Sequence, residues 1–388
     1  MVLGAGTAGA QAPPVLPSTR VLQAGPASLY PVVSLRDVGT DSNVYNDGTS
    51  PKEDFTYTFT SRLHAVVPIG GTRFVGSGAG DFIYYRTYSD QSSLNAYFSG
   101  RYDVVDARVR PFVSTTLATH RERQGLEIDA RARQTQTMLM FGSDFELTAI
   151  TSLIAWVRRE NIAWDHDEYY DGVSLANQLN STADVLAAGA RFRFTPFTTV
   201  TAVAEIQRDR FETSPERDAD SLRIAPSVEF DNGSALTGRA QGGYRSFRPL
   251  NGALEGYDGL VASAGLRYAL FDLTRMYLDG GRDVRASYDP LQPYYLETGL
   301  RFRVVQRIAG PVEAVGILER WQLQHQRLGG QSFDGREEHT TTLGGGVGFR
   351  MSREMELTFT IDRTERTSSD LARGYERRRV LASISYGL

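Results

Sequence analysis

The sequence predicts an all-β fold, a transmembrane antiparallel up-and-down β-barrel of about 18 strands (roughly 16–20) with both termini periplasmic. Three observations predict it. From about residue 30 onward, apolar and polar residues alternate over segments of about 9 to 14 residues. Tight turns and longer polar connections follow one another along the chain. No stretch approaches about 18 consecutive apolar residues, so the sequence offers no candidate transmembrane helix.

Each predicted strand is an alternating segment bounded by turn residues. The predicted strands are 30–40, 54–67, 72–87, 92–103, 107–121, 132–146, 149–163, 182–195, 198–212, 218–231, 234–247, 257–271, 273–286, 291–307, 311–325, 337–351, 354–367 and 374–388. A strand that crosses lipid needs about 9–11 residues, whereas strands of soluble proteins average about 5–6. Because every backbone donor in lipid must be paired, such a sheet has to close on itself.

The alternation assigns one face of each segment to lipid. In 182–195, Leu186, Phe192 and Phe194 share one face, while Arg191 and Arg193 share the other. Two segments fit this scheme badly. In 311–325 the apolar set also carries Glu319, and in 72–87 the phase is unclear beyond Asp81. A β-bulge or an excursion toward the barrel interior would explain each.

The connections fall into two groups. The tight turns are 69–72, 103–106, 146–149, 195–198, 231–234, 271–274, 308–311 and 351–354. The longer ones are 41–54, 122–131, 165–180, 213–218, 250–256 and 329–336, with short exceptions near 89–91 and 288–291. Short turns on one side and long loops on the other are typical of outer-membrane barrels, and an even strand number places both termini on the short-turn side.

Aromatic residues stand near the ends of several apolar sets, where an outer-membrane barrel carries its interfacial girdles. These are Phe194, Phe197, Tyr268, Tyr294, Phe349 and Tyr386. Taken singly, each could also reflect the ordinary preference of aromatic residues for strands.

Composition excludes several classes of protein. With 42 basic and 46 acidic residues the net charge is −4, which argues against a nucleic-acid partner. The absence of cysteine excludes disulfides, thiolate zinc sites and a cysteine nucleophile. The five histidines lie in different segments without metal-ligand spacing, so we expect no metal and no cofactor.

If the apolar sets face lipid, the opposite faces line the lumen with charged residues. The candidate lumen-facing residues are Arg191, Arg193, Glu205, Arg223, Glu229, Arg239, Arg267, Glu297, Arg301, Arg303, Arg350 and Asp362. Arginine and acid stand near one another on neighbouring strands, such as Arg191 with Glu205 and Glu229 with Arg239. They could brace the wall as salt bridges or set the selectivity of a water-filled channel. A barrel of about 18 strands is wide enough for such a channel.

The N-terminal stretch is expected to precede the barrel. Ala10, Gln11 and Ala12 form a small-x-small cleavage signal, which favours residues 1–12 as the remnant of a signal peptide. Residues 13–28 then form a periplasmic lead-in, and residues 29–388 form the barrel.

The last segment carries an assembly signal. Val380, Ala382, Ile384, Tyr386 and Leu388 share one face, with an apolar last residue and an aromatic residue two positions before it. This pattern resembles the C-terminal signal read by the outer-membrane barrel assembly machinery.

The opening strand resembles a known family. Residues 29–35 (LYPVVSL), followed by 41–45 (DSNVY), resemble the start of the putative β-barrel porin type 2 family, outer-membrane β-barrels often found near exopolysaccharide or capsule genes. The resemblance implies an outer-membrane location in a Gram-negative-type bacterium. It also implies contact with lipid and lipopolysaccharide, and export components or polysaccharide as further partners.

Three function hypotheses follow. The first is a porin-like channel for polar solutes or saccharides, linked to exopolysaccharide export. The second is a non-conducting accessory barrel of an envelope polysaccharide system. An outer-membrane enzyme is the least favoured, because no catalytic residue stands out. The acidic stretch Asp165–Glu168 lies in a long loop and could hold Ca²⁺, but a solvated acidic loop is the preferred interpretation.

Overall fold

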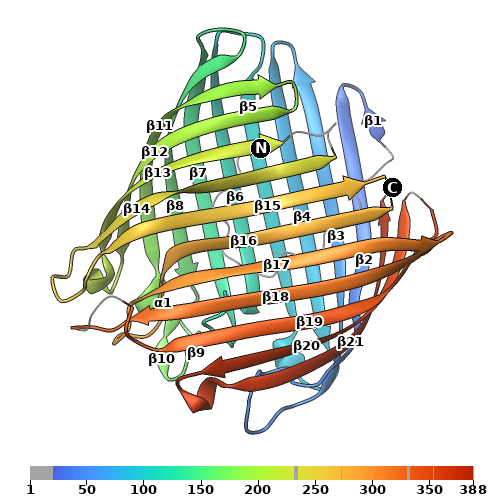
Figure 1. Ribbon diagram of the computed structural model, residues 1–388, viewed down its shortest axis with the longest axis vertical. Helices are drawn as coiled ribbons and strands as arrows, with labels where there is room; N and C mark the ends of the chain where they lie inside the picture. The colour runs from blue at the N-terminus through green and yellow to red at the C-terminus, as the bar shows by residue number, and fades with distance from the viewer. Residues whose placement is uncertain are drawn as a thin grey trace.

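The chain forms a closed β-barrel (Figure 1). The computed structural model describes residues 21–123, 125–230, 235–271, 273–329, 333–352 and 354–387. Its 19-stranded sheet consists of the short β1 and 18 long strands, each antiparallel to its neighbours. The expected signal-peptide remnant (residues 1–12) and Leu388 lie outside the described residues.

The strands of the wall follow one another in chain order around the barrel. They are β2 (Ala27–Asp41), β3 (Asp54–Ile69), β4 (Thr72–Tyr85), β5 (Ser93–Val104), β6 (Val109–Arg123), β7 (Arg131–Glu146), β8 (Thr151–Trp164), β11 (Ser181–Thr195), β12 (Thr198–Phe211), β13 (Ala219–Phe230), β14 (Leu236–Pro249), β15 (Tyr257–Leu270), β16 (Thr274–Ala286), β17 (Tyr294–Ala309), β18 (Val312–Gln326), β19 (Glu337–Arg350), β20 (Met355–Ser368) and β21 (Tyr375–Gly387). Each begins and ends within three residues of a predicted segment, so the strand prediction is confirmed.

The remaining elements are small. They are β1 (Leu22–Ala24), β9 (Tyr169–Tyr170), β10 (Val173–Ser174), α1 (Leu175–Leu179) and three 3-10 turns, η1 (Ser89–Gln91), η2 (Pro215–Arg217) and η3 (Leu371–Arg373). No helix among the described residues is long and apolar enough to span a membrane. β1 pairs with the start of β2 as a hairpin, and β2 itself begins two residues before the expected barrel boundary at residue 29.

Closure occurs between the first and last strands of the wall. β2 pairs with β21 from Val32 opposite Gly387 to Asp41 opposite Arg379, with a bulge where Asp37 has a positive φ. Beside this bulge the strands approach closely, and a Cβ atom on Gly39 would collide with the Val380 carbonyl. The ladder therefore closes without a free edge, as a bilayer requires.

Long connections gather at one end of the barrel and short turns at the other (Figure 1). We call these the long-connection end and the short-turn end. The start of β2 and the end of β21 both lie at the short-turn end. That this end faces the periplasm stays a prediction.

The two segments that fitted the alternation badly have a common explanation. In β18, Val315, Trp321 and Leu323 are buried on the inner face together with Glu319, while Leu318 is 42% exposed outside. The apolar set of β18 therefore faces inward, opposite to the expectation that apolar sets face lipid. In β4 the inner face beyond Asp81 is apolar because Val44, from the connection 42–53, packs on Ile83 and Tyr85.

At the long-connection end, the hairpin β16–β17 departs from the wall. Pairing between β15 and β16 ends at Ala262 opposite Arg282, although β15 begins at Tyr257. Tyr294 and Leu296 at the start of β17 pack on Phe247 of β14 and are each 3% exposed. The prediction that Tyr294 belongs to an exposed girdle is therefore wrong, because this hairpin packs its apolar face against the neighbouring strands.

The other predicted girdle residues, Phe194, Phe197, Tyr268, Phe349 and Tyr386, are at least 36% exposed.

Candidate functional site: the barrel interior and its long-connection end

Alternation puts all the candidate lumen-facing residues on the inner face of the wall. On β11, Leu186 and Phe194 are 57% and 70% exposed on the outside, so Arg191 and Arg193 lie on the opposite face. The same reasoning applies to β12, β13, β14, β15, β17, β19 and β20, where Ile206, Leu222, Tyr244, Leu260, Leu300, Leu343 and Ile361 are the exposed outer residues.

Half of these residues form ion pairs with other strands. The pairs are Arg191 with Asp144 (2.7 Å), Arg223 with Asp283, Glu297 with Arg285 (3.7 Å), Arg301 with Glu319 (2.9 Å), Arg350 with Glu313 (3.0 Å) and Asp362 with Arg379 (2.9 Å). The partner proposed for Arg191, Glu205, is wrong. The register sets Arg191 opposite Thr201, and its guanidinium reaches back across β8 to Asp144 on β7.

The other half form no ion pair with any described residue. These are Arg193, Glu205, Glu229, Arg239, Arg267 and Arg303. Glu229 and Arg239 are register partners as expected, yet Arg239 donates to the Ser227 hydroxyl (3.0 Å). Arg267 stands over the Tyr277 ring, 5.8 Å from its centre. Arg193 is exposed, and the rest are partly exposed.

At the long-connection end, one glutamate links opposite sides of the barrel. Glu127 lies between β6 and β7, and its carboxylate accepts from the hydroxyl of Ser287 and the amide of Tyr288 (3.3 Å), between β16 and β17. It also lies 3.1 Å from His325 Nε2 on β18 and 3.4 Å from Arg336 Nη2. Seven strands separate β6 from β18 around the wall: β19, β20, β21, β2, β3, β4 and β5. The contact therefore spans the opening of the barrel at its long-connection end, which we call the mouth. We call this contact the Glu127 bridge.

A second carboxylate extends this bridge. Glu338 contacts Arg366, Arg373 (2.6 Å) and Arg336 (2.9 Å), and its side chain is 1% exposed. Burial works against the charged form of Arg373, but the neighbouring Glu338 outweighs it and raises the pKa of Arg373. Arg366 in turn contacts Asp129 (2.6 Å), which follows Glu127 by two positions. Arginine thus neutralises the carboxylates of Glu127 and Glu338, as a buried charge requires.

Arg217 in η2 ties three connections together. Its fully buried guanidinium donates to the Gln178 amide oxygen of α1 (2.8 Å), to the Ser287 carbonyl and to the Pro293 carbonyl (3.1 Å). Burial lowers the pKa of Arg217, and nearby Glu127 opposes this shift. An apolar cluster joins residues of several of these connections: Ile128, Ala132, Trp164, Leu175, Ala176, Leu179 and Tyr288. The connections therefore form one packed body across the mouth.

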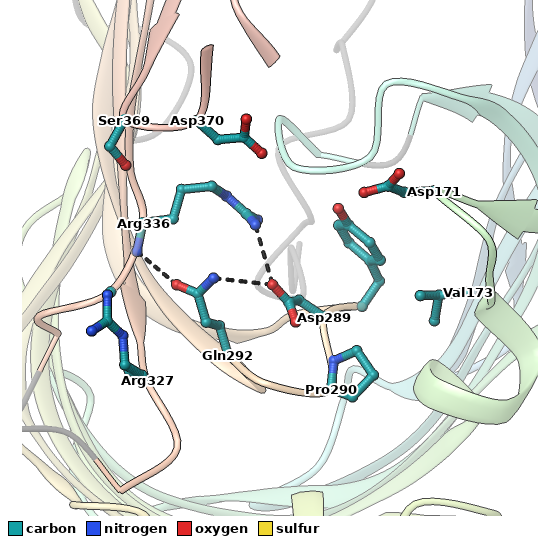
Figure 2. A pocket seen from close by; sticks show the side chains of 11 residues that line it. Asp171, Val173, Asp289, Pro290, Gln292, Arg327, Arg336, Ser369 and Asp370 are labelled. Carbon is teal, nitrogen blue, oxygen red and sulfur yellow. Dashed lines mark hydrogen bonds and ion pairs between the residues drawn. The ribbon is translucent and has the colours of Figure 1, made fainter. Parts of the chain in front are cut away.

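A cavity of about 470 Å³ opens between these connections (Figure 2). The side chains around it include Asp171, Asp289, Asp370 and Arg336. Arg336 Nη1 lies 3.2 Å from Asp289, and Gln292 bridges the Asp289 carboxylate and the Arg336 amide.

The acidic stretch 165–168 is held by arginine. Glu168 accepts from the Arg133 amide (2.9 Å) and lies 3.7 Å from Arg121, while Asp165 lies 3.7 Å from Arg133. Among the described residues, no group of three or more His, Asp or Glu is arranged to hold a metal ion.

Sequence reasoning missed the residues of the Glu127 bridge. They lie in polar connections or at strand ends, where no periodicity marks them. The only available signal was that arginine and acid recur in these connections, and that signal does not say which pairs meet.

The C-terminal residues Val380 and Tyr386 are 54% and 36% exposed on the outer face of β21, with Ala382 and Ile384 between them. Reading by the assembly machinery stays a prediction.

Comparison with known proteins gives the family. The model of the family described as "Putative beta-barrel porin 2" matches residues 22–386. No curated protein sequence matches the chain. Two solved structures from Pseudomonas aeruginosa, the outer membrane protein OpdK (12% identity, TM-score 0.48) and OccK2 (OpdF) in complex with glucuronate (12% identity, TM-score 0.49), each align over 93% of this chain and 98% of their own. The match of the family model over nearly the whole chain, together with the closed 18-strand wall, shows that the chain belongs to this family of porin-like β-barrels of the outer membrane.

Proposed function

We propose that this barrel is a passive channel for small polar solutes, saccharides among them, with the Glu127 bridge narrowing its long-connection end. One observation carries the proposal: six charged residues of the inner face form no ion pair with any described residue. An isolated ion buried in a dry interior costs many kcal/mol, so such groups persist only where water reaches them. Their partial exposure fits a lumen that holds water beside Arg193, Glu205, Arg239 and Arg303.

The charged wall would then act on the solute. Arg193, Arg239, Arg267 and Arg303 lie toward the short-turn ends of β11, β14, β15 and β17 and would favour anionic or hydroxyl-rich solutes. A link to exopolysaccharide export is part of this proposal.

Planar-bilayer recording on the refolded barrel tests the proposal. We expect steady current, and a KCl-gradient reversal potential that moves toward cation preference in Arg193→Gln. Arg208→Gln removes the same charge from the outer face of β12, where Arg208 is exposed, and should leave the potential unchanged. A folded barrel that passes no current would refute the channel.

The packed connections favour a second candidate. Because Glu127, Arg336 and Glu338 join opposite walls, the mouth could be shut, as in an accessory barrel of an envelope polysaccharide system. Such a barrel would bind lipopolysaccharide or export components through its connections. Absence of current from the wild type, with a heat-modifiable gel band, is its expected signature.

We propose no enzymatic role. Ser287 and His325 both contact Glu127. The Ser287 hydroxyl donates its hydrogen bond to the Glu127 carboxylate and not to the His325 imidazole, so the imidazole cannot take the hydroxyl proton. His64 Nδ1 does lie 2.8 Å from Ser77 Oγ, and no described carboxylate contacts that imidazole to orient it. Ester hydrolysis by the wild type that is lost in His64→Ala would overturn this view.

A further inference from the structure

We propose that the outer face of the wall carries a binding site for an acyl lipid with a phosphate headgroup, at the place where β15 and β16 separate. A groove of about 680 Å³ lies there and crosses the strands from β12 to β17. Strands β14 to β17 cross the front of the barrel in Figure 1. The volume of the groove is within the usual range of small-molecule pockets.

The register places this groove on the lipid-facing side of the wall. On β15, Ala262 shares a face with Leu260, which is 70% exposed on the outside. On β17, Thr298 shares a face with the exposed Leu300. Arg282 of β16 lies opposite both Ala262 and Thr298, and residues opposite one another in a sheet point to the same face. Arg282 therefore also belongs to the outer face.

Small side chains hollow the wall at this level. The outer-face positions that line the groove include Ala240, Gly242, Ala262, Ala264 and Gly280. Toward the long-connection end, the exposed side chains of Tyr244 and Leu260 stand beside it. A hollow of this kind on a lipid-facing wall accommodates an acyl chain, which gains close packing there. Shape alone does not choose among lipids, because every membrane lipid brings acyl chains.

A charge in the groove makes that choice. Of the lining residues, all of which belong to the described part of the chain, Arg282 alone is charged. Its Nη1 atom donates to the Thr298 hydroxyl (2.8 Å), and Arg282 forms no ion pair with any described residue. Arg275 and Arg285 of the same strand do pair with glutamate, on the inner face. An arginine on the lipid face destabilises a barrel unless it lies near the interface, where an anionic headgroup can neutralise it.

The depth of Arg282 suits such a headgroup. The exposed ion pair of Arg248 with Asp258 (2.5 Å) marks the polar boundary of the outer face on β14 and β15. Ala262, opposite Arg282, comes four residues after Asp258. Four residues span about 14 Å along a strand, or about 10 Å along the bilayer normal at a tilt of about 45°. An arginine side chain covers much of this distance by reaching toward the interface.

The open edge of β15 adds a second reason for a polar ligand. Pairing with β16 ends at Ala262, so residues 257–261 of β15 have no partner on that strand. Backbone groups without a partner are costly beside lipid. The ester and glycerol oxygens of a lipid could accept from the N–H groups of this edge, while its phosphate meets Arg282 and one chain fills the groove.

A second copy of the barrel fits the groove less well. In a two-fold dimer the same patch meets itself, so two copies of Arg282 would approach each other in an apolar interface. No carboxylate lines the groove in the described part of the chain to offset that repulsion. A phosphate supplies the opposite charge and can accept two hydrogen bonds from one guanidinium.

Native mass spectrometry of the refolded full chain in detergent, titrated with lipid, tests the inference. We expect dioleoylphosphatidylglycerol to bind at least about tenfold more tightly than dioleoylglycerol, which has the same chains and no phosphate. Inorganic phosphate, which has no chains, should form no stable adduct.

Two variants separate the charge from the groove. Arg282→Gln keeps a donor for Thr298 and should weaken phosphatidylglycerol binding about tenfold, with dioleoylglycerol unchanged. Gly242→Leu should weaken the binding of both lipids, because a Cβ atom at Gly242 meets nothing within 4 Å and the side chain would fill the groove. The matched controls are Arg208→Gln and Gly80→Leu, on the outer faces of β12 and β4 outside the groove, and both should bind like the wild type. Heat-modifiable mobility checks that each variant folds.

Three results would overturn the inference: equal binding of the two lipids, wild-type phosphatidylglycerol binding by Arg282→Gln, or wild-type binding of both lipids by Gly242→Leu. A wild-type dimer in analytical ultracentrifugation that Gly242→Leu dissociates would also overturn it and assign the groove to a second copy. The inference does not rest on the proposed channel. Because Arg282 lies outside the lumen, Arg282→Gln should leave the bilayer current unchanged, and a barrel without current would still bind the lipid.

Discussion

Removing the Glu127 carboxylate should loosen the bridge across the mouth of the barrel. In Glu127→Ala, the Ser287 hydroxyl and the Tyr288 amide lose their acceptor. Arg336 loses one of its carboxylates but keeps Glu338 and Asp289. Residues 125–130 would then be attached to the opposite wall chiefly through Asp129, Ile128 and the Glu127 carbonyl, which accepts from Arg373.

The magnitude follows from these contacts. Breaking a buried ion pair costs about 3–5 kcal/mol when the remaining charge is left unpaired. Because Arg336 stays paired, we expect the low end, about 3 kcal/mol. At about 1.4 kcal/mol for each factor of ten, this raises the ratio of open to closed bridge about a hundredfold. The Glu127 side chain is 2% exposed, so salt should screen the effect little.

Single-channel recording measures this ratio directly. We expect Glu127→Ala to increase the open time or the unitary conductance, and Glu127→Gln to do so less, because the amide oxygen still accepts from Ser287. Glu216→Ala changes an exposed glutamate of another connection and serves as the matched control. Currents in Glu127→Ala that equal those of the wild type would refute the reasoning that the bridge limits the passage.

Three further predictions concern closure, packing and pH. Gly39→Ala should prevent closure between β2 and β21 and abolish the heat-modifiable gel band, whereas Gly252→Ala, with open space around it, should migrate like the wild type. Arg217→Met should lower the free energy of unfolding by about 3 kcal/mol in thermal denaturation, since acceptors on two other connections lose their donor, and equal stability to Glu216→Gln would contradict this. Burial raises the pKa of Tyr170 to about 12, so the stabilisation by its neutral form is present below about pH 10 and is lost as pH rises toward 12. Absorbance titration of the wild type against Tyr170→Phe checks it, and a phenol that titrates near 10 would count against burial.

Alternation in the sequence is enough to predict the strands. Leu186, Phe192 and Phe194 can only face lipid together, because successive side chains in a strand point to opposite faces. The same rule puts Arg191 and Arg193 on the inner face, since they occupy the positions between these apolar residues. The asymmetry of the connections then gives the barrel, since short and long connections must gather at opposite ends.

Tertiary structure alone decided which inner side chains meet. Arg191 pairs with Asp144 instead of Glu205 because the stagger between strands sets the register, and stagger leaves no mark in one strand's sequence. Tyr294 carries the pattern of an exposed girdle residue, yet it is buried because the long-connection end of the hairpin β16–β17 separates from β15 and packs inward. Glu127 and His325 are 198 positions apart and lie in segments without periodicity, so only closure of the barrel brings them together. Local pattern thus determined the strands and their faces, whereas contacts across the lumen depend on the closed geometry of the entire sheet.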